Sequence, residues 1–296
     1  MKSSVTLAAL LLALPVSIAA AADLPSKKEP VVAPVVLPVW TGFYAGLNAG
    51  GSWSAGGQQY GDTILRTNLL DNSLVQTGGP SWGLPSNFSG VSAGGQFGYN
   101  YQINSMFIAG LEADFQGSSM NGQGNTIRGY PQYPNPQSPD GIWSASTATA
   151  NSSTAIDWWG TARGRIGVAP LSSMSNLMIY ATGGFAYAGA RAANTLNTVV
   201  EPSLGAGYAR YSYGNTRVGW TVGGGGEWMF MPNWSAKAEY LYTDLGSSRG
   251  YAMGRGVTHA PFVNAFNASN AYRFNTVRLG VNYHVNFAQS PIIAKY

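Results

Sequence analysis

The feature that most constrains the fold of this chain is an alternation of apolar residues with polar or very small ones, repeated in eight segments. These segments lie near residues 40–53, 88–101, 107–115, 156–168, 177–189, 216–230, 234–246 and 276–287. In the third segment Phe107, Leu111 and Phe115 share one parity, whereas Glu112 and Asp114 share the other. Side chains that repeat with a period of two point to opposite faces of a β-strand. The sequence therefore predicts eight strands, each with one apolar and one polar face.

The lengths of these segments and of their connections indicate a membrane barrel. Each segment has about 10–14 residues, whereas strands of soluble domains average roughly 5–6 and a tilted strand crosses a bilayer with roughly 9–11. Short connections alternate with long ones, at 102–106, 169–176 and 231–233 and at 54–87, 117–155, 190–215 and 247–273. This asymmetry is typical of outer-membrane barrels. We therefore predict an all-β fold over residues 40–287: an eight-stranded antiparallel up-and-down transmembrane β-barrel with short periplasmic turns and long extracellular loops.

Composition agrees with this fold and excludes several others. Charged residues make up 9% of the chain, against roughly 25% in an average protein, yet the mean hydropathy is only −0.04. Gly, Ser, Asn and Thr have replaced the charges, which suits strands with two unlike faces. After residue 21 no run approaches the ~18–20 apolar residues of a membrane helix. The scattered net charge of +4 gives no indication of nucleic-acid binding, and the absence of Cys rules out a disulfide framework.

The two ends of the chain differ from the strand-rich middle. Residues 1–21 combine a positive start, an apolar core and small residues near Ala21, which predicts a cleaved secretory signal peptide. Residues 22–39 contain four prolines and are expected to form an extended periplasmic segment. Residues 288–296 are expected to form a short C-terminal tail.

Charged residues on the inward parity are balanced, with five acids and five bases. They are Glu112, Asp114, Asp157, Arg163, Arg165, Arg217, Glu227, Lys237, Glu239 and Arg278. The interior of an eight-stranded barrel is only just wide enough for side chains, and an unpaired charge there is costly. We therefore predict a charge network that largely fills the lumen, with Glu227 and Lys237 paired across the turn near Pro232. A catalytic or conducting constellation is the alternative.

Four consecutive glycines in "WTVGGGGEWMF", residues 220–230, admit two interpretations. A loop that cradles phosphate needs a following helix whose N-terminus meets the anion. Here "EWMFMPNW" follows, which is typical of a strand and a turn. The glycines are better interpreted as spacers in the barrel wall, where they leave room for long neighbours.

Aromatic residues on the outward parity lie mostly toward strand ends, where rings settle at the interface between membrane and water. The residues predicted for this lipid interface are Trp40, Phe43, Trp53, Tyr99, Phe107, Trp158, Trp228, Trp234, Tyr240 and Tyr283. The alternative is the aromatic core of a soluble sandwich.

Several segments together resemble a known family. "WTGFYAGLNAGGSW", "GLEADFQGS", "WWGTARGRIG", "KAEYLYTDLG" and "TVRLGVNYH" are similar to segments of the small outer-membrane β-barrel surface antigens of alphaproteobacteria, porin-family proteins with an OmpA-like membrane domain. The resemblance covers all eight predicted strands but not the loops. It implies the outer membrane of a Gram-negative bacterium, contact with outer-membrane lipids and lipopolysaccharide, and insertion by the barrel-assembly machinery. It supplies no catalytic residue, cofactor or metal ligand.

The function predicted from these observations is structural: a surface antigen that supports envelope integrity, with host or phage contacts through its extracellular loops. A small diffusion porin is the main alternative. A haem-binding surface barrel is another, with ligands drawn from His259, Tyr130, Tyr133, Tyr251 and Tyr272. An enzyme is not expected, because His284 falls near the periplasmic end and His259 has no recognisable nucleophile beside it.

Overall fold

The computed structural model describes the barrel and part of its extensions. It covers residues 40–56, 58–66, 77–78, 82–85, 87–129, 133–134, 142–143, 146–169, 176–200, 205–257 and 263–285. The chain divides into two units, 1–36 and 37–296, and all described residues belong to the second. The predicted signal peptide, the proline-rich segment 22–39 and the tail 288–296 lie outside the described residues.

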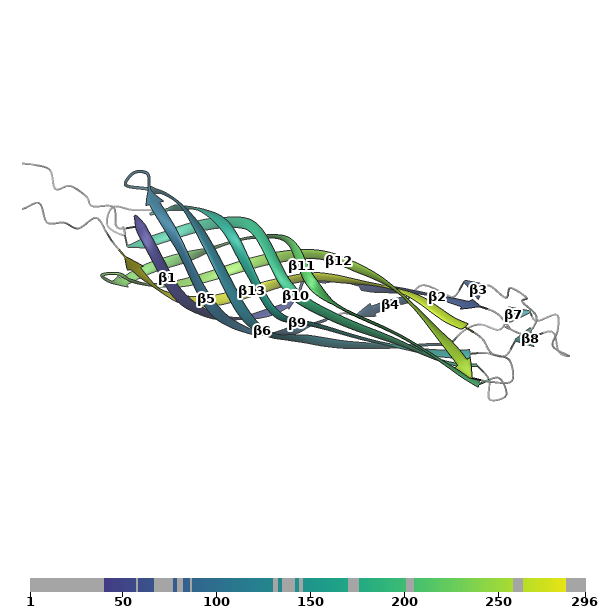
Figure 1. Ribbon diagram of the computed structural model, residues 1–296. Coiled ribbons are helices and arrows are strands. Elements are labelled where there is room, and N and C mark those ends of the chain that lie inside the picture. Colours follow the sequence, from purple (N-terminus) through teal and green to yellow (C-terminus); the bar gives the residue numbers. More distant parts are fainter. Residues whose placement is uncertain are drawn as a thin grey trace, which may run out of the picture. The chain divides into compact units, whose positions relative to one another are not determined.

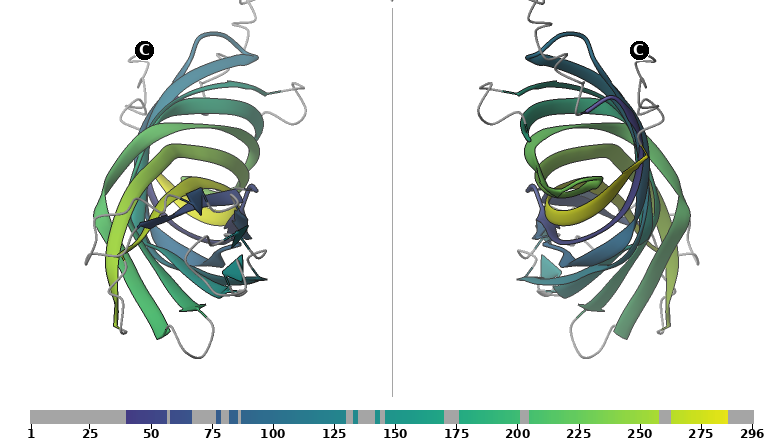
Figure 2. Two further views of the ribbon diagram at one scale, coloured as in Figure 1. Left: turned by 90° about the vertical axis from the view of Figure 1, so that its right-hand side faces the viewer. Right: turned by 90° about the vertical axis from the view of Figure 1, so that its left-hand side faces the viewer.

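Eight long strands form one closed ring. They are β1 (Gly42–Ser54), β5 (Ser89–Gln102), β6 (Phe107–Gly129), β9 (Ser146–Val168), β10 (Leu177–Val200), β11 (Gly205–Met231), β12 (Trp234–Val257) and β13 (Val263–Val285). Each strand pairs antiparallel with the next, and β13 returns to pair with β1 from Phe43↔Val285 to Ser54↔Phe274 (Figures 1 and 2). The predicted eight-stranded antiparallel barrel is confirmed.

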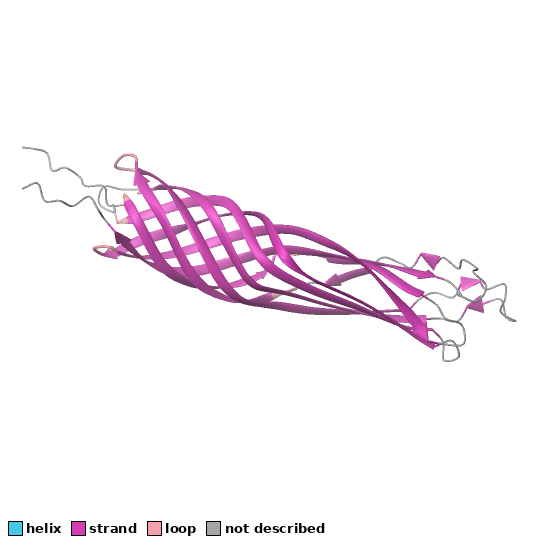
Figure 3. Cartoon of the chain, in the orientation of Figure 1, coloured by secondary structure: helices cyan, strands magenta, loops and turns pink. Residues whose placement is uncertain are grey.

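Five short strands accompany the ring. They are β2 (Gln58–Arg66), β3 (Thr77–Gly78), β4 (Trp82–Pro85), β7 (Tyr133–Pro134) and β8 (Ile142–Trp143). β2 pairs with the first part of β13 and with β3 and β4, whereas β7 pairs only with β8. Figure 3 shows the described elements as strands and loops. No helix among the described residues is long and apolar enough to cross a membrane.

The outer surface of the ring is an apolar belt. Leu47, Leu111 and Ile166 have exposed fractions of 73%, 71% and 70%, and large apolar residues from all eight long strands share their orientation. Their neighbours along the strand, such as Asn48 and Glu112, are buried in the lumen. An apolar surface of this extent is stable only in lipid, so this part of the barrel spans the membrane.

The strands are longer than the alternation predicts. β6, β9 and β13 each have 23 residues, β10 and β12 have 24, and β11 has 27. Much of 117–155, 190–215 and 247–273, which we predicted as loops, therefore continues the strands beyond the ring (Figure 1). The loop prediction is wrong there because the polarity of the two strand faces is the reverse of that in the ring. In β9 and β10 the apolar residues Ile156 and Leu196 point inward and are buried, whereas Arg191 points outward and is exposed.

β-Bulges mark the level at which this inversion occurs. The strand register shifts between Gly117 and Met120 in β6, at Asp157 in β9, opposite Gly189 and Ala190 of β10, and between Asp244 and Ser247 in β12. The extra residue exchanges the inward and outward parities in β9 and β12, whereas β6, β10, β11 and β13 keep their parity and change only in the polarity of the residues on each face. On the ring side of the bulges the apolar residues face lipid, and beyond them they face inward. We place the boundary of the bilayer on the loop side at this level.

Beyond the ring the wall divides into two sheets. β11 pairs with β12 up to Trp220↔Asp244 and then not again until Gly207↔Gly256. One sheet is the outer part of β6, β9, β10 and β11, and the other is formed by β12, β13 and β2. Buried apolar residues, among them Phe88, Met120, Trp159, Leu245 and Phe274, form a core that extends from the loop-side part of the ring into this part of the wall.

This boundary can be tested with two arginine substitutions on the same strand face. Leu111 and Gln123 both point outward on β6, but Leu111 lies in the apolar belt and Gln123 lies beyond the bulge. Leu111→Arg should lower the free energy of unfolding in lipid vesicles by about 2–4 kcal/mol, because a charge near the bilayer centre is poorly solvated. Gln123→Arg should leave it unchanged in a denaturant titration. Equal losses for both variants would contradict the proposed boundary.

Candidate functional site

Glu112 is the centre of a buried charge network in the lumen. Its carboxylate accepts hydrogen bonds from Lys237 Nζ at 2.8 Å, Arg163 Nη2 at 2.5 Å and Arg165 Nη1 at 3.2 Å, and Arg278 Nη2 lies 3.5 Å away. Tyr44 donates its hydroxyl to the same carboxylate at 2.8 Å. One acid on β6 is therefore bound to four cations that come from β9, β12 and β13.

Two arginines join the remaining acids of this network. Arg278 Nη2 lies 2.8 Å from Asp114 and 2.7 Å from Glu239. Arg163 reaches the same two carboxylates at 3.1 and 3.0 Å, through Nη2 and Nη1 respectively. Thr161 donates to Asp114 at 2.7 Å. Each guanidinium thus bridges carboxylates from different strands, which its rigid fork of donors favours.

Arg165 lies between two aromatic rings. Its guanidinium carbon is 4.8 Å from the ring centre of Tyr44 and 4.9 Å from that of Tyr180, and its Nη2 binds Glu227 at 2.8 Å. Glycines in the wall make room for both rings. A Cβ at Gly98 would overlap the Tyr44 hydroxyl, and one at Gly225 would lie 3.0 Å from the Tyr180 hydroxyl and closer still to a backbone carbonyl. At Gly225 the glycine run therefore acts as the predicted spacer.

Eight of the ten charged residues predicted for the lumen belong to this network. They are Glu112, Asp114, Arg163, Arg165, Glu227, Lys237, Glu239 and Arg278, and none is more than 3% exposed. Four acids face four bases, so the network carries no formal net charge. A buried charge is tolerated only when it is paired and hydrogen-bonded, and this set meets that condition through contacts across the lumen.

The predicted ion pair between Glu227 and Lys237 is wrong. The two residues are opposite each other in the register of β11 and β12, as expected. However, Lys237 binds Glu112, whereas Glu227 binds Arg165 and accepts hydrogen bonds from Ser235 at 2.6 Å. In so narrow a ring the far wall is within reach of a long side chain, so neighbours on adjacent strands need not pair.

Asp157 and Arg217 were also predicted for the network and lie outside it. Asp157 is the extra residue of the β9 bulge, so it escapes the inward parity and binds Arg191 on the surface at 2.5 Å. Arg217 lies on the loop side of the network, opposite Ala188 in the register of β10 and β11. Its guanidinium is 5.2 Å from the ring centres of Tyr213 and Tyr272 and donates to the Ser247 carbonyl at 3.0 Å.

Trp40 was predicted to face lipid, and it is fully buried instead. It lies at the end of the lumen where the short turns are, with its ring in edge contact with His284 at 5.8 Å between centres. Trp40 precedes the first residue of β1, so the parity of that strand does not determine its orientation. It belongs to an apolar cluster with Ile108, Ala169, Met178, Tyr180 and Met229.

The other nine predicted interface aromatics lie on the outside of the barrel. Eight have exposed fractions of 38–57%, and Trp158 is half-buried in a stack with Phe115. Phe43, Tyr99, Phe107, Trp228, Trp234 and Tyr283 lie toward the turn end of the ring, and Trp53, Trp158 and Tyr240 lie toward the loop end. These two levels match the positions at which rings meet the two faces of a bilayer.

Ser235, His284 and Glu227 form a constellation that the sequence pattern did not reveal. His284 Nε2 lies 2.9 Å from Ser235 Oγ and 3.2 Å from Glu227 Oε1. A catalytic triad needs the acid and the nucleophile on different ring nitrogens, whereas here both meet the same one. All three side chains are also inaccessible, with exposed fractions of 0–1%. The arrangement is a buried hydrogen-bond network without the geometry of a hydrolase.

The residues considered for haem are scattered. Tyr272 is fully buried and Tyr251 is 48% exposed. His259 and Tyr130 lie outside the described residues, and only the backbone of Tyr133 is described. Within the described part of the chain, no group of three or more His, Cys, Asp or Glu residues could hold a metal ion.

Removing the central carboxylate tests the energetic role of this network. Glu112→Gln should lower the free energy of unfolding by about 3–5 kcal/mol, because it leaves buried cations without their counter-charge. Asp157→Asn, which removes a carboxylate from an exposed ion pair, should have no measurable effect. Urea titration of both variants in vesicles gives the comparison. A Glu112→Gln barrel as stable as the unsubstituted protein would contradict the assigned role.

Comparison with known proteins supports the identification that the fold and the lumen suggest. The family described as "Outer membrane protein beta-barrel domain" matches residues 6–284. The 31 kDa outer-membrane immunogenic proteins of Brucella melitensis and Brucella suis are each 33% identical over 255 residues, which cover 86% of this chain and 87% of theirs.

Solved barrels align over most of the chain at low identity. OprG from Pseudomonas aeruginosa is 11% identical, with a TM-score of 0.37, over 83% of this chain and 98% of its own. Neisserial surface protein A is 14% identical, with a TM-score of 0.31, over 83% and 98% respectively. The family match and the Brucella relatives decide the assignment: this chain belongs to the outer-membrane β-barrel protein family and is an outer-membrane protein.

Proposed function

We propose that this protein is a structural outer-membrane barrel that supports the envelope, displays a surface antigen and does not conduct. Three layers inside the ring support a closed lumen. The Trp40 cluster occupies the periplasmic end, the charge network fills the middle, and the apolar core around Trp159 and Phe274 fills the external half. Two of these layers are apolar, which is unlike the water-filled interior of a porin.

The contact between Lys237 and Glu112 carries this proposal. In the ring order β1-β5-β6-β9-β10-β11-β12-β13, β6 and β12 are four strands apart and therefore on opposite sides. Their side chains nevertheless meet at 2.8 Å, and both are almost completely buried. An ion crossing the barrel would have to break this bridge and the arginine bridges beside it, each of which is strengthened by the low dielectric of the interior.

The antigen part of the proposal rests on the relatives and on the extension beyond the bilayer. Both Brucella relatives are named immunogenic outer-membrane proteins. In this chain the strands continue past the bulges with polar residues such as Gln123, Arg191 and Arg210 on the outside. This surface would meet antibodies, phage or host molecules, while lipid and lipopolysaccharide surround the ring and the barrel-assembly machinery inserts it.

Two alternatives have less support. A small porin would require a polar path past the Trp40 cluster and the outer apolar core. A haem-binding barrel loses Tyr272 as a surface ligand, because that residue is buried. An enzymatic role is disfavoured by the shared nitrogen of the Ser235–His284–Glu227 constellation.

Conductance in a planar bilayer tests the proposal. The refolded protein, shown to be folded by its heat-dependent shift in gel mobility, should give no stable current steps. Trp40→Ala should also be silent, because the charge network still closes the lumen. The charge-balanced double variant Glu112→Ala with Lys237→Ala should give small, intermittent steps, because it removes the bridge across the ring.

Stable open steps from the folded, unsubstituted protein would overturn the closed-lumen proposal and favour a small porin. Current steps from Trp40→Ala alone would show that the periplasmic cluster, rather than the charge network, closes the lumen. Silence from the folded double variant would show that the apolar layers, rather than the bridge, exclude ions.

A further inference from the structure

We propose that the lumen binds an enclosed cluster of ordered water at the boundary between the charge network and the apolar core. The site is formed by Asp114 and Arg278 of the charge network, Trp159 of the apolar core, and Gln116. It assigns a ligand to buried polar atoms that no side chain of the described lumen satisfies. The inference goes beyond the closed-lumen proposal, because it concerns what the closed interior contains.

Asp114 shows the need for a ligand most clearly. Its Oδ2 accepts hydrogen bonds from Thr161 at 2.7 Å, Arg278 Nη2 at 2.8 Å and Arg163 Nη2 at 3.1 Å. Its Oδ1 is buried and has no hydrogen-bond partner among the described residues. A buried carboxylate oxygen without a donor is costly. This oxygen therefore requires a donor that the neighbouring side chains do not provide.

Two donors in the same part of the lumen need an acceptor. Arg278 donates from Nε to Glu239 and from Nη2 to Asp114, whereas its Nη1 has no acceptor in the described part of the chain. The guanidinium carbon lies 5.8 Å from the ring centre of Trp159, whose indole Nε1 is also buried without an acceptor there. Guanidinium and indole N–H groups can donate but not accept, so neither can satisfy the other.

Gln116 adds an amide that can both donate and accept. It is opposite Trp159 in the register of β6 and β9, it is two residues beyond Asp114 on the same strand face, and it is fully buried. Neither its Oε1 nor its Nε2 has a partner among the described residues. Gly94 on β5 leaves room for this side chain, because a Cβ there would lie 2.8 Å from Gln116 Oε1. Three strands thus bring unpartnered donors and acceptors to one layer of the lumen.

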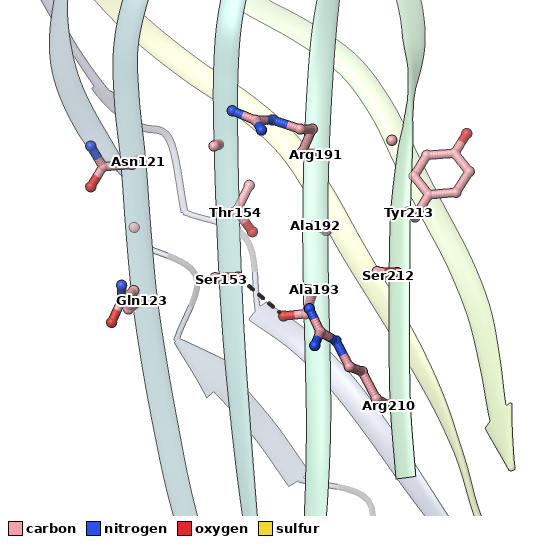
Figure 4. A pocket seen from close by; sticks show the side chains of 13 residues that line it. Asn121, Gln123, Ser153, Thr154, Arg191, Ala192, Ala193, Arg210, Ser212 and Tyr213 are labelled. Atoms are coloured by element: carbon pink, nitrogen blue, oxygen red, sulfur yellow. Dashed lines mark hydrogen bonds between the residues drawn. The ribbon is translucent and has the colours of Figure 1, made fainter. Parts of the chain in front are cut away.

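Polar side chains on the outside of the barrel do not need such a ligand. Gln123 and Arg210 line a shallow hollow on the outer face of the extension (Figure 4), and both are exposed, so solvent can reach their polar atoms. The four residues of the lumen site are almost completely buried. The rest of the charge network lies on their turn side, and on their loop side Phe274 contacts Trp159 edge-on at 5.5 Å between ring centres. A molecule bound at this layer is therefore enclosed.

The chemistry of these atoms selects water over an ion. The charge network is already neutral, with four acids and four bases, so an added ion would be an uncompensated charge in a poorly solvated interior. An anion would also leave Asp114 Oδ1 without a donor, and a cation would be repelled by Arg278. Water can accept from the guanidinium and the indole while it donates to the carboxylate. Buried waters make about three such hydrogen bonds each to otherwise unsatisfied polar groups.

The cluster hydrates the loop-side face of the charge network, which otherwise borders directly on apolar side chains. It lowers the cost of burying Asp114 and Arg278 because it completes their hydrogen bonds. It opens no path for ions, since the apolar cluster around Trp40 and the apolar core around Phe274 lie on its two sides. A lumen of this kind is closed without being dry.

The first test is NMR of the refolded, isotope-labelled full chain in detergent micelles. The indole N–H of Trp159, assigned by its loss in Trp159→Phe, should show cross-peaks to water with NOE and ROE of opposite sign, which identify water with a long residence time. The indole N–H of Trp228, which lies on the outside of the barrel, is the control and should show no long-lived water. A Trp159 indole without such cross-peaks would overturn the proposal.

The second test uses the sign of a stability change. Gln116→Met replaces the amide by an apolar chain of similar length. In a hydrated site it should lower the midpoint of urea unfolding in vesicles, because the water loses its partners. In a dry site it should raise the midpoint, because it removes buried groups that have no partner, and that result would contradict the proposal. Gln123→Met, on the exposed outer face of the same strand, is the matched control and should leave the midpoint unchanged.

An anion in place of water would be recognised by its salt dependence. The midpoint of the unsubstituted protein should not change when chloride replaces fluoride at constant ionic strength, and a rise with chloride would replace the water cluster by an anion site. The NMR measurement uses the unsubstituted chain, so it decides the matter if Gln116→Met does not fold. None of these experiments measures current, so their failure is distinguishable from a failure of the closed-lumen proposal.

Discussion

A strand inside a bilayer has no water to satisfy its backbone, so each N–H and C=O must pair with a neighbouring strand. The pairing of β1 with β13 meets this requirement by closing the ring, and the rest of the structure depends on that closure. Eight strands leave a lumen too narrow to hydrate charged groups. Lys237 and Glu112 therefore meet across the ring, and the guanidinium of Arg165 is held between Tyr44 and Tyr180 instead of by solvent.

The same strands pass through two environments with opposite demands. Around the charge network the outward residues are apolar and the inward ones polar. Toward the loop side the inward residues become an apolar core, and beyond the bulges the outward residues are polar. β6, β10, β11 and β13 satisfy both environments at constant parity, because the polarity of the residues on each face changes along the strand. In β9 and β12 an extra residue, near Asp157 and Asp244 respectively, also changes the parity within the strand. The change of residue polarity along the strands, together with the bulges of β9 and β12, thus lets one sheet be a membrane barrel at one end and a water-exposed fold at the other.

Period-two alternation was enough to predict the strands of the ring, their order and the inward side of most charges, because burial on a strand follows parity. It could not predict features that break parity. Asp157 is a bulge residue and Trp40 precedes β1, so both were assigned to the wrong environment. Alternation also says nothing of contacts across the lumen, which is why Glu227 and Lys237 were paired with each other. The extension was taken for loops because the polarity of its two faces is inverted, and in β9 and β12 the inversion also follows a shift of register.

The sharing of Glu112 among four cations has a consequence for how such a chain can diverge. A single substitution there disturbs several ion pairs at once, so the interior can drift only when two or more positions change together. The polar residues on the outer face of the extension have no such mutual dependence. Substitutions can therefore accumulate on the exterior one residue at a time, whereas the interior changes only through coupled substitutions.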